Sequence, residues 1–107
     1  MPQYVVRLEH TSDQCPGANA KVRERIAKGT PEMPRLAQTL GIKILIGPLV
    51  LAIQHESFLV VETDRVETVN DFIMQSGLMQ WNTVNVSAVK PFEEVMKDFE
   101  RMPPPIY

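Results

Sequence analysis

The clearest structural signal lies in residues 58–73, FLVVETDRVETVNDFI, where a run of apolar residues gives way to a helical repeat. Phe58 to Glu62 is apolar at nearly every position, which is typical of a strand buried on both faces. Asp64-Arg65-Val66-Glu67 then has the spacing of a capping box, with Asp64 as the N-cap. Apolar residues repeat at helical spacing as far as Ile73, and Gly77 can end that helix. The stretch therefore predicts a strand followed by a helix.

Upstream of this unit, the sequence predicts two strands separated by a helical region. Residues 4–9 alternate between apolar and polar, which is the period of a strand, and His10 follows in the apolar phase. A helical region is expected to begin at Pro16 and to end at Gly41, with a break at Thr30-Pro31. Residues 42–53 then predict a second strand with a bend at Gly47-Pro48.

Downstream, residues 84–89 alternate as a fourth strand, and residues 92–99 predict a short amphipathic helix. The predicted order is βαββαβ followed by a C-terminal helix. This is the ferredoxin-like α+β pattern, with a four-stranded antiparallel sheet in the order 4-1-3-2. Residues 1–107 carry no internal repeat and no sign of a boundary, so we expect a single domain.

Composition indicates a small soluble domain of ordinary make-up. Hydrophobic residues make up 44% of the chain and charged residues 22%, which argues against wholesale disorder. Eleven basic residues against thirteen acidic ones give a formal charge of -2, whereas nucleic-acid binders carry a basic excess. A single cysteine forms no internal disulfide, and the N-terminal residues show no basic-then-apolar leader. We therefore expect a cytoplasmic protein with neither nucleic acid nor a membrane as its partner.

The element order and several short sequences resemble the small dimeric α+β barrel proteins of ferredoxin-like fold. The resemblance rests on Phe58–Asp64, on Trp81 ahead of the last strand and on the exit Val89-Lys90-Pro91. The resemblance is strongest to an uncharacterised group of short domains whose third strand ends, like residues 61–64 here, in an apolar residue followed by Glu, an acidic residue or Thr, and Asp. The superfamily includes cofactor-free monooxygenases, haem-degrading enzymes, lactone isomerases, dehalogenating enzymes and plain binding proteins. The resemblance implies a fold and a homodimer, and it leaves the function open.

His10, Cys15 and His55 are predicted to meet at one end of the sheet. The first and third strands are antiparallel neighbours in the expected topology, so the end of one lies beside the start of the other. The connector with Cys15 returns over the same edge. Imidazole and thiolate are ligands of Zn²⁺, Ni²⁺ and Cu, and three protein ligands leave an open position. We predict a divalent transition-metal site, with zinc as the default, nickel or copper as alternatives, and Asp13 or Glu56 as a fourth ligand or outer partner.

Each of these residues also has a simpler interpretation. The spacing of His10 and Cys15 matches no established metal motif. The histidines can be surface or interface groups, and Cys15 can pack as a small hydrophobe. Cys15 also precedes the expected helix start at Pro16, where the helix dipole would favour a thiolate, so a Cys15–His10 nucleophile pair is a further alternative. The sequence offers no third residue to orient such a pair.

A second candidate site is a small-molecule pocket formed by Arg7, Glu9 and Trp81. Arg7 and Glu9 alternate with the apolar residues of the first strand and so point to the sheet face opposite the helices. In a ferredoxin-like dimer, that face lines a shared cavity, and Trp81 would form its floor. The alternatives are a structural Arg7–Glu9 pair and a tryptophan that packs against an edge strand.

Three functions remain open from the sequence. The leading hypothesis is a small homodimeric binding protein that holds a metal or small ligand at the His10/Cys15/His55 end of the sheet. An enzyme of the cofactor-free monooxygenase or isomerase type is the alternative, with His10 as acid/base and an organic substrate in the sheet cavity. The third is a structural or regulatory dimer with no ligand. A homodimer is common to all three, because two helices cover one face of the sheet whereas Phe58 to Val61 is apolar on both.

Overall fold

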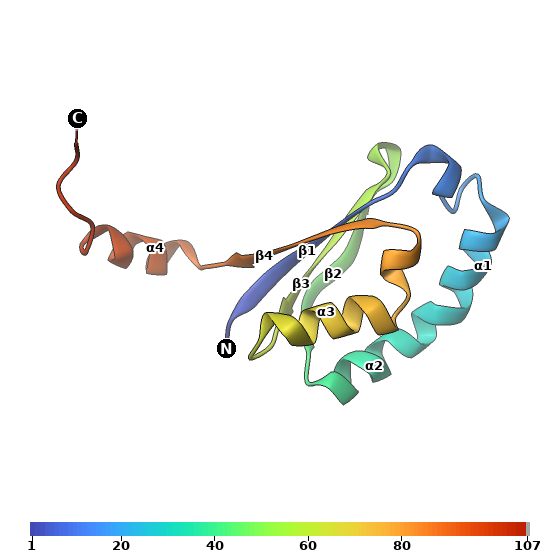
Figure 1. Ribbon diagram of the computed structural model, residues 1–107, viewed down its shortest axis with the longest axis horizontal. Helices are drawn as coiled ribbons and strands as arrows, with labels where there is room; N and C mark the ends of the chain where they lie inside the picture. The colour runs from blue at the N-terminus through green and yellow to red at the C-terminus, as the bar shows by residue number, and fades with distance from the viewer. Residues whose placement is uncertain (107) are drawn as a thin grey trace.

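The computed structural model describes residues 1–106, so Tyr107, the last residue of the predicted domain, lies outside that range. A four-stranded antiparallel sheet has the order β2-β3-β1-β4 (Figure 1). The strands are β1 (Gln3–Glu9), β2 (Lys43–Leu51), β3 (Glu56–Glu62) and β4 (Thr83–Val89). The helices are α1 (Ala20–Gly29), α2 (Met33–Leu40), α3 (Val66–Gln75) and α4 (Phe92–Phe99), with short 3₁₀ turns η1 (Ser12–Gln14), η2 (Thr30–Glu32), η3 (Ala52–Gln54) and η4 (Leu78–Gln80). The predicted α+β, ferredoxin-like topology and its strand order are confirmed.

The core lies between one sheet face and the helices. Alternation along β1 buries Tyr4, Val6 and Leu8 toward α2 and α3, while Arg7 and Glu9 stay exposed on the other face. The largest fully buried side chains are Val6, Leu59, Val61, Val69 and Phe72. They come from the two central strands and from α3, which explains why these three elements gave the strongest signals in the sequence.

Two details of the helices differ from expectation, and one agrees. The first helix begins at Ala20, not at Pro16, because Asn19 is its N-cap. Arg65, not Asp64, is the N-cap residue of α3, and its side chain makes no capping hydrogen bond, so the predicted capping box is wrong. The break between α1 and α2 is confirmed, and α2 ends at Gly41 with a left-handed φ of 77°.

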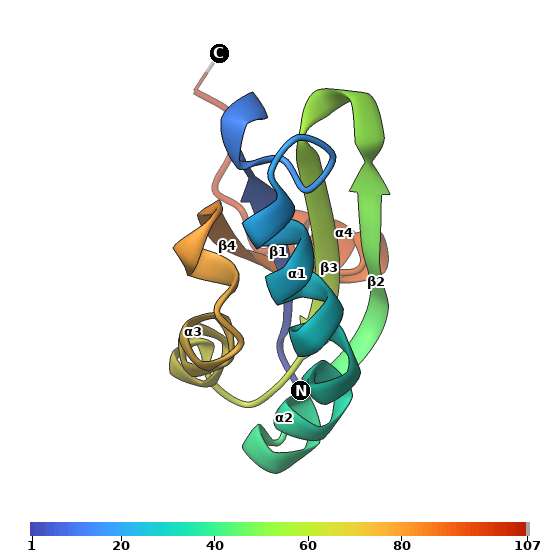
Figure 2. The same cartoon turned by 90° about the vertical axis from the view of Figure 1, so that its right-hand side faces the viewer.

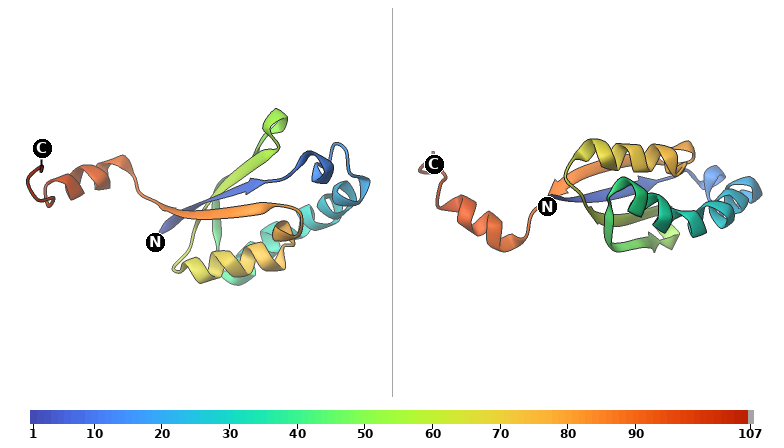
Figure 3. Two further views of the ribbon diagram at one scale, coloured as in Figure 1. Left: turned by 45° about the horizontal axis from the view of Figure 1, so that its top comes forward. Right: turned by 90° about the horizontal axis from the view of Figure 1, so that it is seen from below.

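Helices α1, α2 and α3 all lie on one side of the sheet (Figure 2). The opposite face is open, and β2 contributes exposed apolar side chains to the surface, among them Ile46 and Leu49, each 49% exposed. After β4 the chain leaves the sheet, and α4 projects past the end that holds the N-terminus (Figure 3), which stretches the molecule to 55 × 33 × 18 Å. Across residues 1–106, no helix has the length and apolar character needed to cross a bilayer.

Candidate functional site

The pairing of β1 with β3 brings His10 and His55 together. Their ladder runs from Gln3↔Glu62 to Glu9↔Glu56, and one step further the backbone N–H of His10 donates to the carbonyl of His55 at 3.0 Å. His55 sits in the β2–β3 turn with a φ of 53°. The two rings meet edge to face, with centroids 5.3 Å apart. Residues 45 positions apart in the chain are thus neighbours because of backbone register.

Cys15 is carried by a tight loop between η1 and α1, at the same end of the sheet as the β2–β3 turn (Figure 1). Its carbonyl accepts hydrogen bonds from the N–H groups of Ala18 at 2.9 Å and Asn19 at 2.7 Å. The Asn19 side chain caps α1 through Oδ1, and its Nδ2 donates to the Asp13 carbonyl at 3.0 Å. One asparagine therefore fixes both the helix start and the loop that holds the thiol.

This loop corrects the expectation of a helix-activated thiolate. Because α1 begins at Ala20, Cys15 does not adjoin a helix N-terminus. Instead, Arg23 reaches back from α1 and donates from Nε to the Pro16 carbonyl at 2.9 Å and from its terminal nitrogen to the Gly17 carbonyl at 3.3 Å. The loop is held by hydrogen bonds from the helix that follows it, so the position of Cys15 is restrained although it belongs to no regular element.

The three predicted ligands form one cluster. His10, Cys15 and His55 each offer a donor atom, and these atoms all lie within 4.8 Å of one another. The ligand atoms of a tetrahedral zinc are roughly 3.5 Å apart, so only small side-chain rotations separate this arrangement from a coordinating one. All three residues are half-buried, and the single thiol is free.

Three of the four ring nitrogens of this cluster are buried without hydrogen-bond partners. Both nitrogens of His10 and Nδ1 of His55 are buried, and none is bonded to a group within residues 1–106. Buried polar atoms are nearly always satisfied, and leaving one without a partner costs free energy. Trp81 packs against His10 with a ring-centroid distance of 5.3 Å, which holds the imidazole in place without satisfying it. In each ring, the nitrogen that carries no hydrogen is therefore available to bind a metal ion.

Neither acidic candidate completes the set. Glu56 lies on the open face and accepts hydrogen bonds from Arg7 Nε at 3.2 Å and from its terminal nitrogen at 2.8 Å. The hydroxyl of Thr11 holds the pKa of Asp13 below its usual value, with backbone N–H groups adding to the effect. The metal-capable cluster found among residues 1–106 has three members, so a fourth position would fall to water or to a bound molecule.

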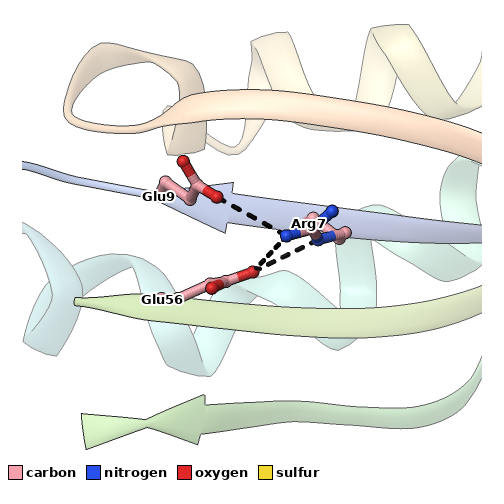
Figure 4. A network of polar contacts seen from close by, with 3 residues as sticks. All are labelled: Arg7, Glu9 and Glu56. Atoms are coloured by element: carbon pink, nitrogen blue, oxygen red, sulfur yellow. Dashed lines mark hydrogen bonds and ion pairs between the residues drawn. The ribbon is translucent and has the colours of Figure 1, made fainter. Parts of the chain in front are cut away.

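The structure separates the residues of the predicted pocket. Arg7 and Glu9 lie on the open face, where Arg7 lies 3.5 Å from Glu9 and bonds Glu56 more closely (Figure 4). The hydrogen bond to Glu56, followed by its negative charge, raises the pKa of the Arg7 guanidinium. Trp81 lies on the helix side, beside His10. Arg7 and Glu9 therefore lie on the opposite sheet face from Trp81, and Arg7 pairs with Glu56 in addition to the Glu9 that the sequence suggested.

Trp81 instead lines a cavity between α1 and the sheet, with a volume of about 710 Å³. Its apolar wall includes Leu8, Ile26, Met33 and Leu78, and His10 connects it to the metal-capable cluster. Sequence reasoning missed this cavity because helical periodicity does not reveal how far a helix stands from a sheet. The available signal was α1 itself, which carries only two large apolar residues, Val22 and Ile26, over ten positions.

Comparison with known proteins adds no family to this description. The sequence matches no protein-family model and no curated protein. The geometry of the cluster and of the cavity beside it is therefore what bears on function.

Proposed function

We propose that this protein is a homodimer that binds a divalent transition metal through His10, Cys15 and His55. The observation that carries the metal site is the cluster itself: three soft or borderline donors within 4.8 Å, formed by a strand end, a loop and a turn. Its buried imidazole nitrogens lack partners, and a metal ion would supply a partner for one nitrogen of each ring. In a purely structural histidine pair, those nitrogens would more commonly be hydrogen-bonded to carbonyl or carboxylate groups.

The donor set favours zinc and leaves a position open. Two imidazoles and one thiolate match zinc chemistry, with bonds of about 2.0–2.1 Å to nitrogen and 2.3 Å to sulfur. Nickel and copper accept the same donors, so the preference is one of degree. Three protein ligands suit a site that exchanges its fourth ligand, since structural zinc sites are usually closed by four.

Metal content tests this proposal directly. Protein purified without a polyhistidine tag should contain close to one transition-metal ion per chain by mass spectrometry, or take one up after chelation. Cys15→Ser should weaken zinc binding by at least about tenfold, because a thiolate ligand is lost. Met74→Leu, a change at an exposed sulfur on α3, is the matched control and should leave affinity unchanged. Equal affinities of wild type and Cys15→Ser would refute the site.

The homodimer is supported by two apolar surfaces that a single chain leaves uncovered. One is the open sheet face with Ile46 and Leu49. The other is α4, where Phe92 is 72% exposed, Phe99 50% and Met96 48%. Because α4 projects beyond its own sheet (Figure 3), a second copy is the occupant that covers both surfaces by one two-fold contact.

Removal of α4 tests the dimer. The full chain should show a dimeric mass by light scattering at micromolar concentration, and a chain ending at Pro91 should show a weaker dimer. Phe92→Asp with Phe99→Asp places charge in the same contact without shortening the chain, and should shift the mass toward a monomer. A full-length chain that is monomeric throughout this range would refute the proposal.

A further inference from the structure

The cavity between α1 and the sheet is lined by three cations and, among the described residues, by no carboxylate. Arg23, Arg25 and Lys28 from α1 all contribute to its lining. This is unusual for a chain whose formal charge is -2. A concave site with one sign of charge on a low-dielectric wall concentrates ligands of the opposite sign.

The two arginines keep their positive charge uncompensated. Arg23 donates only to the backbone carbonyls of Pro16 and Gly17, and Arg25 donates to Gln80 Oε1 at 3.1 Å. These acceptors are neutral, and within residues 1–106 neither arginine forms an ion pair. Lys28 differs, because it pairs with Glu24 at 3.0 Å. Arg25 uses one of its five donors, so two of the others can donate to a carboxylate.

Apart from the cations, the lining of the cavity is mainly apolar. Leu8 and Leu78 are buried core residues that contribute to it, together with Ile26, Met33 and Trp81. A volume of about 710 Å³ is in the range of small-molecule sites, which typically combine apolar walls with a few polar groups. The arrangement matches a molecule that has an apolar body and one negatively charged end.

We infer that this cavity binds a small organic carboxylate, with its apolar body between α1 and β1 and its carboxylate at Arg25. The inference goes beyond metal binding, since Arg25, Ile26 and Leu78 are not metal ligands. His10 is shared by both sites, so a bound carboxylate lies next to the metal cluster without depending on it.

Trp81 provides the readout, because it is the single tryptophan of the chain and lines the cavity. The probes are octanoate, 1-octanol and octylammonium, which share one apolar chain and differ in charge at the end. Octanoate should change the fluorescence of Trp81 with an affinity about tenfold above that of octanol, and octylammonium should bind most weakly. Equal affinities of octanoate and octanol, or no response to any of the three, would overturn the inference.

Two pairs of variants locate the binding. Arg25→Gln should weaken octanoate binding by about tenfold and leave octanol unchanged, whereas Arg35→Gln, at an exposed arginine on α2 outside the cavity, should change neither. Gly29→Leu adds a side chain where a Cβ meets nothing within 4 Å, and should weaken both octanoate and octanol. Ala27→Leu, elsewhere on α1, is its control. Full octanoate affinity in both Arg25→Gln and Gly29→Leu would contradict the assignment.

The titrations are made on chelated protein and repeated with one equivalent of zinc. Binding of octanoate without metal supports the cavity site whatever the outcome for zinc. Binding that requires zinc would mean that the carboxylate is a metal ligand, and would overturn the assignment to Arg25.

Discussion

Replacing His10 with phenylalanine is predicted to stabilise the metal-free protein and to remove most of its stabilisation by zinc. Both ring nitrogens of His10 are buried and lack partners within residues 1–106. A buried polar group without a partner costs about 1–3 kcal/mol. Phenylalanine keeps the ring contacts with His55 and Trp81, each at a centroid distance of 5.3 Å, and removes that cost. The adjoining cavity leaves room for the larger ring.

The expected shifts in Tm follow from the free energy of the unpartnered imidazole and from that of zinc binding. For a domain of about 100 residues, 1 kcal/mol shifts Tm by roughly 4–8 °C, so the metal-free variant should melt at least about 4 °C above wild type. Zinc at a hundredfold excess over its Kd adds about 2.7 kcal/mol to the wild type, which raises Tm by roughly 10–20 °C. The variant retains two donors and should gain only a small fraction of that shift.

Differential scanning calorimetry of untagged protein, with chelator or with zinc, measures both effects. Met74→Leu serves as the control that should follow wild type in both conditions. If His10→Phe lowers the Tm of the metal-free protein, the imidazole is a packing residue whose nitrogens cost nothing. If zinc raises the Tm of variant and wild type equally, His10 is not a ligand.

Three further predictions concern the loop, the strand bend and the C-terminal helix. Asn19→Ala removes the cap of α1 and the tie to Asp13, so it should cost about 1 kcal/mol in urea unfolding and weaken zinc binding; unchanged zinc affinity would show that the loop holds Cys15 without it. Gly47→Ala should destabilise by more than about 2 kcal/mol, because φ is +90° and the new Cβ would meet the Phe58 carbonyl oxygen at 2.7 Å; an unchanged midpoint would mean that β2 relaxes freely. Lys90, with Arg101, holds the pKa of Asp98 below its usual value, so the stabilising contact is complete above the ordinary aspartate pKa of about 3.9 and is lost as pH falls through the lowered one. The protection factors of the α4 amides, taken relative to the intrinsic exchange rate at each pH, should fall only in that acid range, and protection factors independent of pH would contradict the contact.

The long-range part of the candidate site could be predicted from the sequence because it depends on topology. Alternation in β1 and the apolar run in β3 identify two central strands, and antiparallel pairing then places His10 beside His55. Core residues of these strands face the helices as their period requires. The periodicity of the strands was thus enough to predict a contact between residues far apart in the chain.

The local details depended on which of several possible capping residues sets a helix start, and hydrophobic periodicity does not show this. Pro16 is compatible with a helix start, but Asn19 accepts two backbone N–H bonds and so sets the start at Ala20. Cys15-Pro16-Gly17 is itself a turn-like sequence, which was the available signal. Arg7 and Trp81 lie on opposite faces of the sheet, because Trp81 follows η4 on the helix side. No pattern in the sequence indicates where Trp81 lies relative to β4.

The hydrogen bond between the His10 N–H and the His55 carbonyl has a consequence for assembly. This bond extends the β1–β3 ladder, so the register of these two strands determines where both imidazoles lie. A slip of β1 by one residue would turn His10 to the open face together with the whole buried side of that strand. A chain that has formed its sheet in the wrong register, or not yet formed it, therefore offers no paired imidazoles. Metal uptake would then select the correctly registered sheet and report when folding of the central strands is complete.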